Sequence, residues 1–258
     1  MSKHERIDII LTEKGLVESR SQAQRLIMAG QVRVEGQVIY KASRRVARNA
    51  QIDIESLPQY VSRGGDKLAA ALDRYPIDIV DKVCADVGAS TGGFTDCLLQ
   101  NGAARVYAID VGQGILHWRL RKDARVVVME KTNARKLDSL PELVDLATID
   151  ASFISLRTLL PVVCGWLKPQ ADLLALIKPQ FEAGKKKIGK QGVVRDTAIH
   201  REVVERVVQA AIALDLSPRG VMRSPLRGPK GNVEFLLWCR NEATEKAFEL
   251  SEDLFLPA

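Results

Sequence analysis

The chain has 258 residues, of which 46% are hydrophobic and 27% charged, enough for one large α/β domain and a small second domain. Its formal net charge of +6 suits a polyanionic partner such as nucleic acid. No apolar run approaches the roughly 18 residues that span a bilayer, and the first residues lack the apolar core of a secretion signal, so we expect a cytoplasmic protein without membrane contact. Four single cysteines and three dispersed histidines predict neither a disulfide framework nor a metal site.

Residues 1–56 have the pattern of a small α+β domain. Ser19 begins a helical pattern that Gly30 ends, and short apolar runs with strand character follow up to residue 54. Each arginine taken alone is more typical of a solvated surface, but together they form a cationic helix face beside a basic sheet rim that suits phosphates. The candidate RNA-binding residues of this domain are Arg6, Arg20, Arg25, Arg44 and Arg45.

The order of residues in this region is similar to a known module. The runs Gly15-Leu-Val-Glu-Ser-Arg20 and Leu26-Ile-Met-Ala-Gly30-Gln-Val-Arg-Val-Glu-Gly36 closely resemble the S4 RNA-binding domain. That resemblance implies binding of structured RNA through the helical face. Residues 57–61 contain a proline and predict a short linker to the next domain.

Residues 62–240 alternate between strand and helix patterns, and residues 241–258 form a C-terminal tail. The alternation predicts a doubly wound parallel sheet with helices on both faces. No helix separates the last two strands, which predicts an antiparallel last strand, as in the class I (Rossmann-like) methyltransferase fold that the pattern resembles. We expect strands at 83–87, 105–110, 125–130, 145–150, 172–178, 217–223 and 232–239, and helices at 66–73, 93–101, 113–121, 155–167 and 197–214.

The most informative segment is 83–94, an apolar run that ends in an acid and enters a glycine-rich turn. Such glycines let a backbone approach a ligand closely, although a tight turn in another α/β protein is the alternative. The spacing differs from G-x-G-x-x-G, and the acid before the first glycine suits S-adenosylmethionine better than a dinucleotide. A second run ends in Asp110, where nucleotide-type folds hold ribose hydroxyls. The candidate cofactor-binding residues are Asp86, Gly88, Ser90, Gly92, Gly93, Phe94, Asp110 and Asn133.

Polar residues also border apolar runs elsewhere in this domain. Asp150 and Lys178 follow strand patterns, Glu234 lies near the start of the last one, and Lys67 opens a helix. All four are expected at one edge of the sheet, where α/β proteins bind ligands. For any one of these residues taken alone, a structural ion pair is about as favoured as a catalytic role. The pairs would be Lys178 with Asp150 and Lys67 with Glu234. Together the four resemble the K-D-K-E tetrad of FtsJ/RrmJ-like ribose 2′-O-methyltransferases.

Further motifs extend the resemblance along nearly the whole chain. Ser62-Arg-Gly-Gly-Asp-Lys-Leu68, Leu176-Ile-Lys-Pro-Gln-Phe-Glu182 and Gly228-Pro-Lys-Gly-Asn-Val-Glu-Phe235 occur in the order typical of the TlyA family, behind an S4 domain. The resemblance implies transfer of a methyl group from S-adenosylmethionine to a cytidine 2′-hydroxyl of ribosomal RNA. Lys178 would be the general base, Asp150 would orient it, and Lys67 and Glu234 would position the ribose.

Alternatives to this interpretation belong to other classes. One is a non-enzymatic RNA-binding or ribosome-assembly factor, which the complete tetrad disfavours. The other is a membrane-active haemolysin, an older label of the family, disfavoured by the lack of a membrane segment. Phe153 or Phe181 could stack on a splayed base. The cationic loop with Lys185, Lys186 and Lys187 could clamp phosphates, although such loops are more often just solvated.

Overall fold

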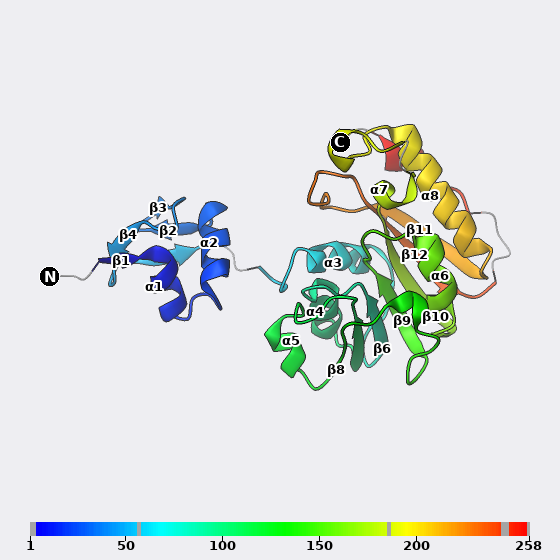
Figure 1. Cartoon of the computed structure of the whole chain (residues 1–258), viewed down its shortest axis with the longest axis horizontal. Helices are drawn as coiled ribbons and strands as arrows, with labels where there is room; N and C mark the ends of the chain where they lie inside the picture. The colour runs from blue at the N-terminus through cyan, green and yellow to red at the C-terminus, as the bar shows by residue number, and fades with distance from the viewer. Residues whose placement is uncertain (1–3, 56–57, 185–186, 244–247, 257–258) are drawn as a thin grey trace. The chain divides into compact units, whose positions relative to one another are not determined.

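The computed structural model describes residues 4–55, 58–184, 187–243 and 248–256 (Figure 1). The chain divides into two compact units, Met1–Pro58 and Gln59–Ala258. Each unit has its own buried apolar core. Among the described residues, no helix is both long enough and apolar enough to cross a membrane.

The first unit packs two helices against two small sheets. Ser19 caps the second helix as expected, because its Oγ accepts a hydrogen bond from Gln22 N (3.2 Å), while Gln22 Oε1 accepts one from Glu18 N (2.8 Å). The first helix and one strand pair are additions to the sequence-based expectation. The elements are β1 (His4–Arg6), α1 (Ile7–Glu13), α2 (Arg20–Met28), β2 (Val32–Val34), β3 (Gln37–Val38), β4 (Arg45–Ala47) and β5 (Ile52–Ile54).

The second unit is built on a seven-stranded sheet in the order β11-β12-β10-β9-β6-β7-β8. The pairs among β8, β7, β6, β9 and β10 are parallel, and β12 is antiparallel to both of its neighbours. This arrangement confirms the doubly wound sheet with an antiparallel last strand. The strands are β6 (Val83–Val87), β7 (Arg105–Ile109), β8 (Val126–Met129), β9 (Val144–Ile149), β10 (Leu167–Ile177), β11 (Leu216–Arg223) and β12 (Phe235–Asn241).

Helices cover both faces of this sheet, and a core lies under each layer (Figure 1). One core includes side chains of α6 and α8, and the other includes side chains of α3 and α4. The α-helices are α3 (Gly64–Arg74), α4 (Gly93–Gln100), α5 (Trp118–Lys122), α6 (Leu156–Cys164), α7 (Pro179–Glu182) and α8 (Thr197–Ile212); the 3-10 helices are η1 (Ala134–Lys136), η3 (Lys190–Gly192) and η4 (Glu252–Phe255).

Both ends of the second unit differ from the expectation. Tyr60, placed in the linker by its sequence, is buried in the core that contains α3 and α4. Phe255, placed in the C-terminal tail, is buried in the core on the opposite face of the sheet. Single aromatic residues outside a periodic pattern carry no signal of burial in the sequence, so only the tertiary structure identifies them as core.

Candidate active site

A cleft of about 700 Å³ opens at the carboxyl ends of β6, β9 and β10. This is the edge of an open α/β sheet where ligands bind. Its walls come from segments that are far apart in the sequence: residues 62–67, 88–94, 150–153, 178–181 and 226–234. All four candidate catalytic residues line this cleft.

Lys178 directly follows β10, and Pro179 after it starts α7. Its Nζ lies 2.5 Å from Asp150 Oδ1. The same nitrogen donates hydrogen bonds to Ser152 Oγ (3.1 Å) and to the carbonyl oxygen of Asp150 (3.3 Å). Three oxygens on the loop after β9 therefore fix the position of a buried amino group.

Lys67 and Glu234 form the second ion pair of the cleft. Lys67 lies in the first turn of α3, and its Nζ is 2.6 Å from Glu234 Oε2. Glu234 directly precedes β12 rather than lying within it, because the strand begins at Phe235. Gly228 leaves room for this carboxylate, since a Cβ there would approach Glu234 Oε1 to 2.6 Å.

The glycine-rich loop is packed mainly against the protein itself. A Cβ at Gly88 would lie 2.8 Å from the carbonyl oxygen of Asp150, and one at Gly93 would lie 2.3 Å from Ser62 Oγ. Gly92 adopts a φ of +96°, and a Cβ there would lie 2.2 Å from Leu120 Cδ1. The glycines therefore let the loop pack closely against its neighbours, and Gly88 and Gly93 also line the cleft.

Asp86 lies beneath this loop and not on the surface of the cleft. It is fully buried, and its carboxylate accepts hydrogen bonds from Thr95 Oγ1 (2.6 Å) and Thr148 Oγ1 (3.3 Å). Burial raises its pKa to about 7, although the hydrogen bonds from Thr95 and Thr148 favour the charged form. Asp86 thus joins β6, α4 and β9 under the cleft floor.

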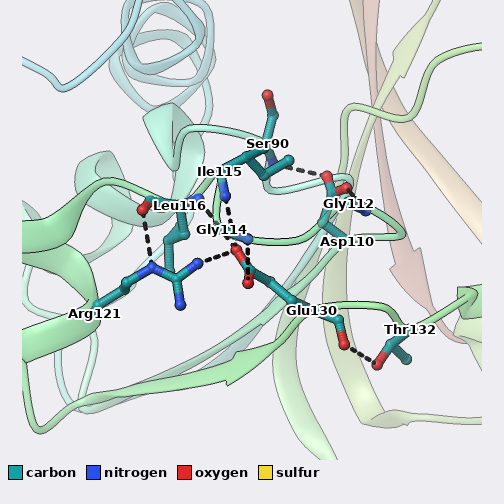
Figure 2. Close-up of polar contacts among 9 residues, drawn as sticks. All are labelled: Ser90, Asp110, Gly112, Gly114, Ile115, Leu116, Arg121, Glu130 and Thr132. Atoms are coloured by element: carbon teal, nitrogen blue, oxygen red, sulfur yellow. Dashed lines mark hydrogen bonds and ion pairs between the residues drawn. The ribbon is translucent and has the colours of Figure 1, made fainter.

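Asp110 connects two loops at the same edge (Figure 2). Its Oδ2 accepts a hydrogen bond from Ser90 N (2.8 Å), and its Oδ1 accepts one from Gly112 N (2.7 Å). The carboxylate therefore holds the loop after β6 against the loop after β7. Asn133 lies outside the cleft lining and caps η1, since its Oδ1 accepts a hydrogen bond from Arg135 N (3.1 Å).

Glu130 performs a similar task one strand further on, and the sequence analysis missed it. Its carboxylate accepts hydrogen bonds from Gly114 N (2.7 Å), Ile115 N (3.1 Å) and Leu116 N (3.2 Å), and it pairs with Arg121 (Figure 2). The Arg121 guanidinium and the Gly114 N–H group lower the pKa of Glu130 to about 2. Its signal was available: like Asp110, it is an acid directly after a strand-like apolar run.

Two aromatic rings stand at the mouth of the cleft. Phe153 is 91% exposed and has a φ of +63°, which is uncommon for a bulky side chain. Its ring centroid lies 5.0 Å from that of Phe181. An exposed ring held by a strained backbone beside Lys178 is a candidate stacking surface.

The candidate RNA-binding residues of the first unit fall into two groups. Arg6 and Arg20 share the buried carboxylate of Asp8, with N–O distances of 2.9 and 3.0 Å, and Gln24 Nε2 donates to it as well (3.0 Å). Hydrogen bonds from these groups hold the pKa of Asp8 well below its usual range. The remaining candidates, Arg25, Arg44 and Arg45, are exposed.

The cationic loop of the second unit is only partly visible. Lys185 and Lys186 lie outside the described residues. Lys187 is exposed and forms an ion pair with Glu202 on α8. A phosphate would therefore have to compete with Glu202 for this lysine.

Comparison with known proteins identifies the family that each unit matches. The model of the FtsJ-like methyltransferase family matches residues 60–241, and that of the S4 domain matches residues 5–52. The 16S/23S rRNA (cytidine-2′-O)-methyltransferase TlyA of Mycobacterium tuberculosis is 45% identical, over 96% of this chain and 93% of its own. Hemolysin A of Brachyspira hyodysenteriae is 37% identical, over 90% of this chain and 98% of its own.

A solved structure agrees with these matches. A protein of Streptococcus thermophilus that also bears the name hemolysin superposes with a TM-score of 0.73 and 41% identity, over 94% of this chain and 90% of its own. The sheet order, the glycine-rich loop and the family match all concern the same unit of the chain. The chain therefore belongs to the FtsJ-like methyltransferase family and carries an S4 domain ahead of its methyltransferase domain.

Proposed function

We propose that the protein transfers a methyl group from S-adenosylmethionine to the 2′-hydroxyl of a cytidine in ribosomal RNA. The observation that carries this proposal is the meeting of two lysine–carboxylate pairs, from four distant segments, in one cleft beside a glycine-rich loop. The choice of ribosomal RNA and cytidine rests on the name of the Mycobacterium tuberculosis relative. A substrate in ribosomal subunits would be met in the cytoplasm.

The cleft suits this cofactor in size and in chemistry. About 700 Å³ lies within the usual range for a small-molecule site. The Asp150 carboxylate beside the glycine-rich loop provides an anion for a cationic ligand, and Asp110 and Ser90 provide polar groups at the adjoining edge. When bound, S-adenosylmethionine supplies an electrophilic methyl group. We assign its binding to residues 88–94 and Asp110, with Asp86 supporting the loop from below and Asn133 on the adenine side.

Lys178, as the neutral amine, accepts the proton of the ribose hydroxyl while the hydroxyl oxygen attacks the methyl group. The three oxygens around Nζ are already in place to stabilise the ammonium group that forms. Because these partners are fixed beforehand, little reorganisation is needed during the reaction. Asp150 holds Lys178 in this position.

Lys67 and Glu234 line the same cleft and position the ribose. Their charges are nearly cancelled by each other at 2.6 Å, so they can orient hydroxyl groups without attracting a bare counterion. Placing the hydroxyl in line with the methyl group accounts for much of the expected rate. Phe153, the more exposed of the two rings, stacks on the target base after it leaves the RNA fold.

Transfer of a labelled methyl group tests the proposal. The purified protein is incubated with methyl-labelled S-adenosylmethionine and with small or large ribosomal subunits, and the modified nucleotide is mapped. We expect label in 2′-O-methylcytidine. Label on a base, or no transfer to either subunit, would refute the assignment. Binding of RNA and cofactor without transfer would favour a ribosome-assembly factor.

A further inference from the structure

A second cleft of about 490 Å³ lies next to the catalytic one. Its walls come from the residues before and within the first turns of α8, from the end of β11 and from the C-terminal helix η4. Arg227 and Lys230 line both clefts. The loop that separates them, residues 226–231, is therefore a shared wall, and a ligand in one cleft adjoins a ligand in the other.

The lining of this second cleft is cationic. Arg195, Arg223, Arg227 and Lys230 contribute to it, and no carboxylate does among the described residues. Asp196 lies beside it in sequence, but its Oδ1 accepts a hydrogen bond from Ala198 N (2.9 Å) as the cap of α8. Burial lowers the pKa of His200, which also lines the cleft, so its imidazole adds shape rather than charge at neutral pH.

These cations contrast with other arginines of the same unit. Arg105, Arg125 and Arg219 each form an ion pair with a carboxylate. Within the parts of the chain that the structure describes, Arg195, Arg227 and Lys230 form none, and Arg223 donates only to the carbonyl oxygen of Leu256 (3.0 Å). Four cations without a carboxylate partner among the described residues give this hollow a positive potential that favours an anion.

The floor of the cleft is apolar. It is formed by buried side chains that include Val194, Phe235 and Phe255. An apolar floor under cationic walls suits a phosphorylated nucleotide better than a bare inorganic ion, because the sugar and base cover the floor while the phosphate meets the cations.

We propose that this second cleft binds a nucleotide of the RNA strand next to the methylated one, holding its phosphate with Arg195 and Arg223. This inference rests on the proposed function. The shared wall lets one strand place its target ribose beside Lys178 and the adjoining nucleotide in the second cleft. The anchored phosphate would then hold the strand while the target nucleotide is drawn out of the fold.

The test variant is Arg195→Gln, because Arg195 is exposed and lies outside the catalytic cleft. Arg219→Gln is the matched control, since it removes the same charge from a cation that is paired with Glu242 outside both clefts. The affinity of each protein for the ribosomal subunit that contains the target nucleotide is measured at several salt concentrations. For Arg195→Gln we expect about tenfold weaker binding and a salt slope reduced by about one, with unchanged cofactor affinity and melting temperature. Arg219→Gln should match the unchanged protein.

Equal effects of the two substitutions, or an unchanged salt slope in Arg195→Gln, would overturn the proposal. A second arm adds cytidine monophosphate to the protein without RNA. If the nucleotide binds and Arg195→Gln abolishes that binding while leaving RNA binding intact, the cleft takes a free nucleotide and the strand assignment is wrong. The salt slope needs no turnover, so a protein that binds RNA but transfers no methyl group would refute the proposed reaction separately.

Discussion

The two units both contain ion pairs around a buried carboxylate, but they differ in how far the cation is exposed. In the first unit Asp8 is fully buried, while the side chain of Arg20 is 52% exposed. In the second unit the lysine of each pair is buried: the side chain of Lys178 is 9% exposed and that of Lys67 is 11% exposed. The first arrangement presents cations to solvent, and the second confines them to a cleft.

We therefore associate the exposed cations of the first unit with RNA binding and the confined lysines of the second unit with catalysis. Exposed guanidinium groups remain available to phosphates, and Asp8 fixes their direction at little cost because several donors share it. A confined ammonium group interacts more strongly with its few partners, since water screens it less. Variants of each arrangement should therefore affect different measurements, and the following predictions test that separation in order of expected effect.

The largest effect is expected for Lys178→Ala. Loss of the proton acceptor should reduce methyl transfer to ribosomal subunits by at least about a thousandfold, with cofactor and RNA affinity retained. Lys168→Ala is the control, because Lys168 lies at the other end of β10 and pairs with Asp145 at 2.9 Å outside the cleft. Near-normal turnover by Lys178→Ala would mean that the confined pair is structural.

Asp8→Asn should destabilise the first unit by about 2 kcal/mol, because charge-assisted hydrogen bonds from Arg6 and Arg20 to a buried acceptor are weakened. The pKa of Asp8 is lowered by folding, so its stabilising contribution is complete above about pH 4 and is lost as the pH falls below that. Hydrogen exchange of residues 4–55 should show the difference at pH 7 and a smaller one at pH 3. Asp53→Asn, an exposed acid of β5, should change neither value.

Asp110→Ala should weaken cofactor binding by at least about tenfold in calorimetry. The substitution removes the acceptor of Ser90 N and Gly112 N, so both loops lose their connection, and it removes the expected partner of the ribose hydroxyls. Asp138→Ala, an exposed acid outside the cleft lining, serves as the control. Unchanged affinity would remove Asp110 from the cofactor site.

The smallest effect is expected for Arg25→Gln in the first unit. Losing one phosphate contact should reduce the salt slope of RNA binding by about one and leave methyl transfer at saturating RNA unchanged. Arg33→Gln carries the same charge change, but Arg33 is paired with Glu55 at 2.7 Å and should matter less. If Arg25→Gln lowers turnover at saturating RNA, the separation between a binding unit and a chemical unit fails.

Local sequence patterns were sufficient to predict most strands of the second unit and the meeting of the four cleft residues. Apolar runs such as 83–87 coincide with β6, and the rule that parallel strands end at one edge brings Asp150 and Lys178 together. The helix expected at 113–121 is shorter in the structure, where α5 begins at Trp118. Glu130 accepts hydrogen bonds from the backbone N–H groups of residues 114–116 and so holds them in a loop.

The sequence by itself determined the fold class, the family and the edge of the sheet where chemistry would occur, because these depend on periodicity and on motifs that are local in the chain. Only the tertiary structure decided which charged groups are partners. Asp8, Glu130 and the second cleft were not foreseen, since an acid or an arginine has the same local pattern whether it is paired, buried or free. Pairing depends on distance in space, and even the Lys67–Glu234 pair, which the sequence offered only as one alternative, joins residues 167 positions apart in the chain.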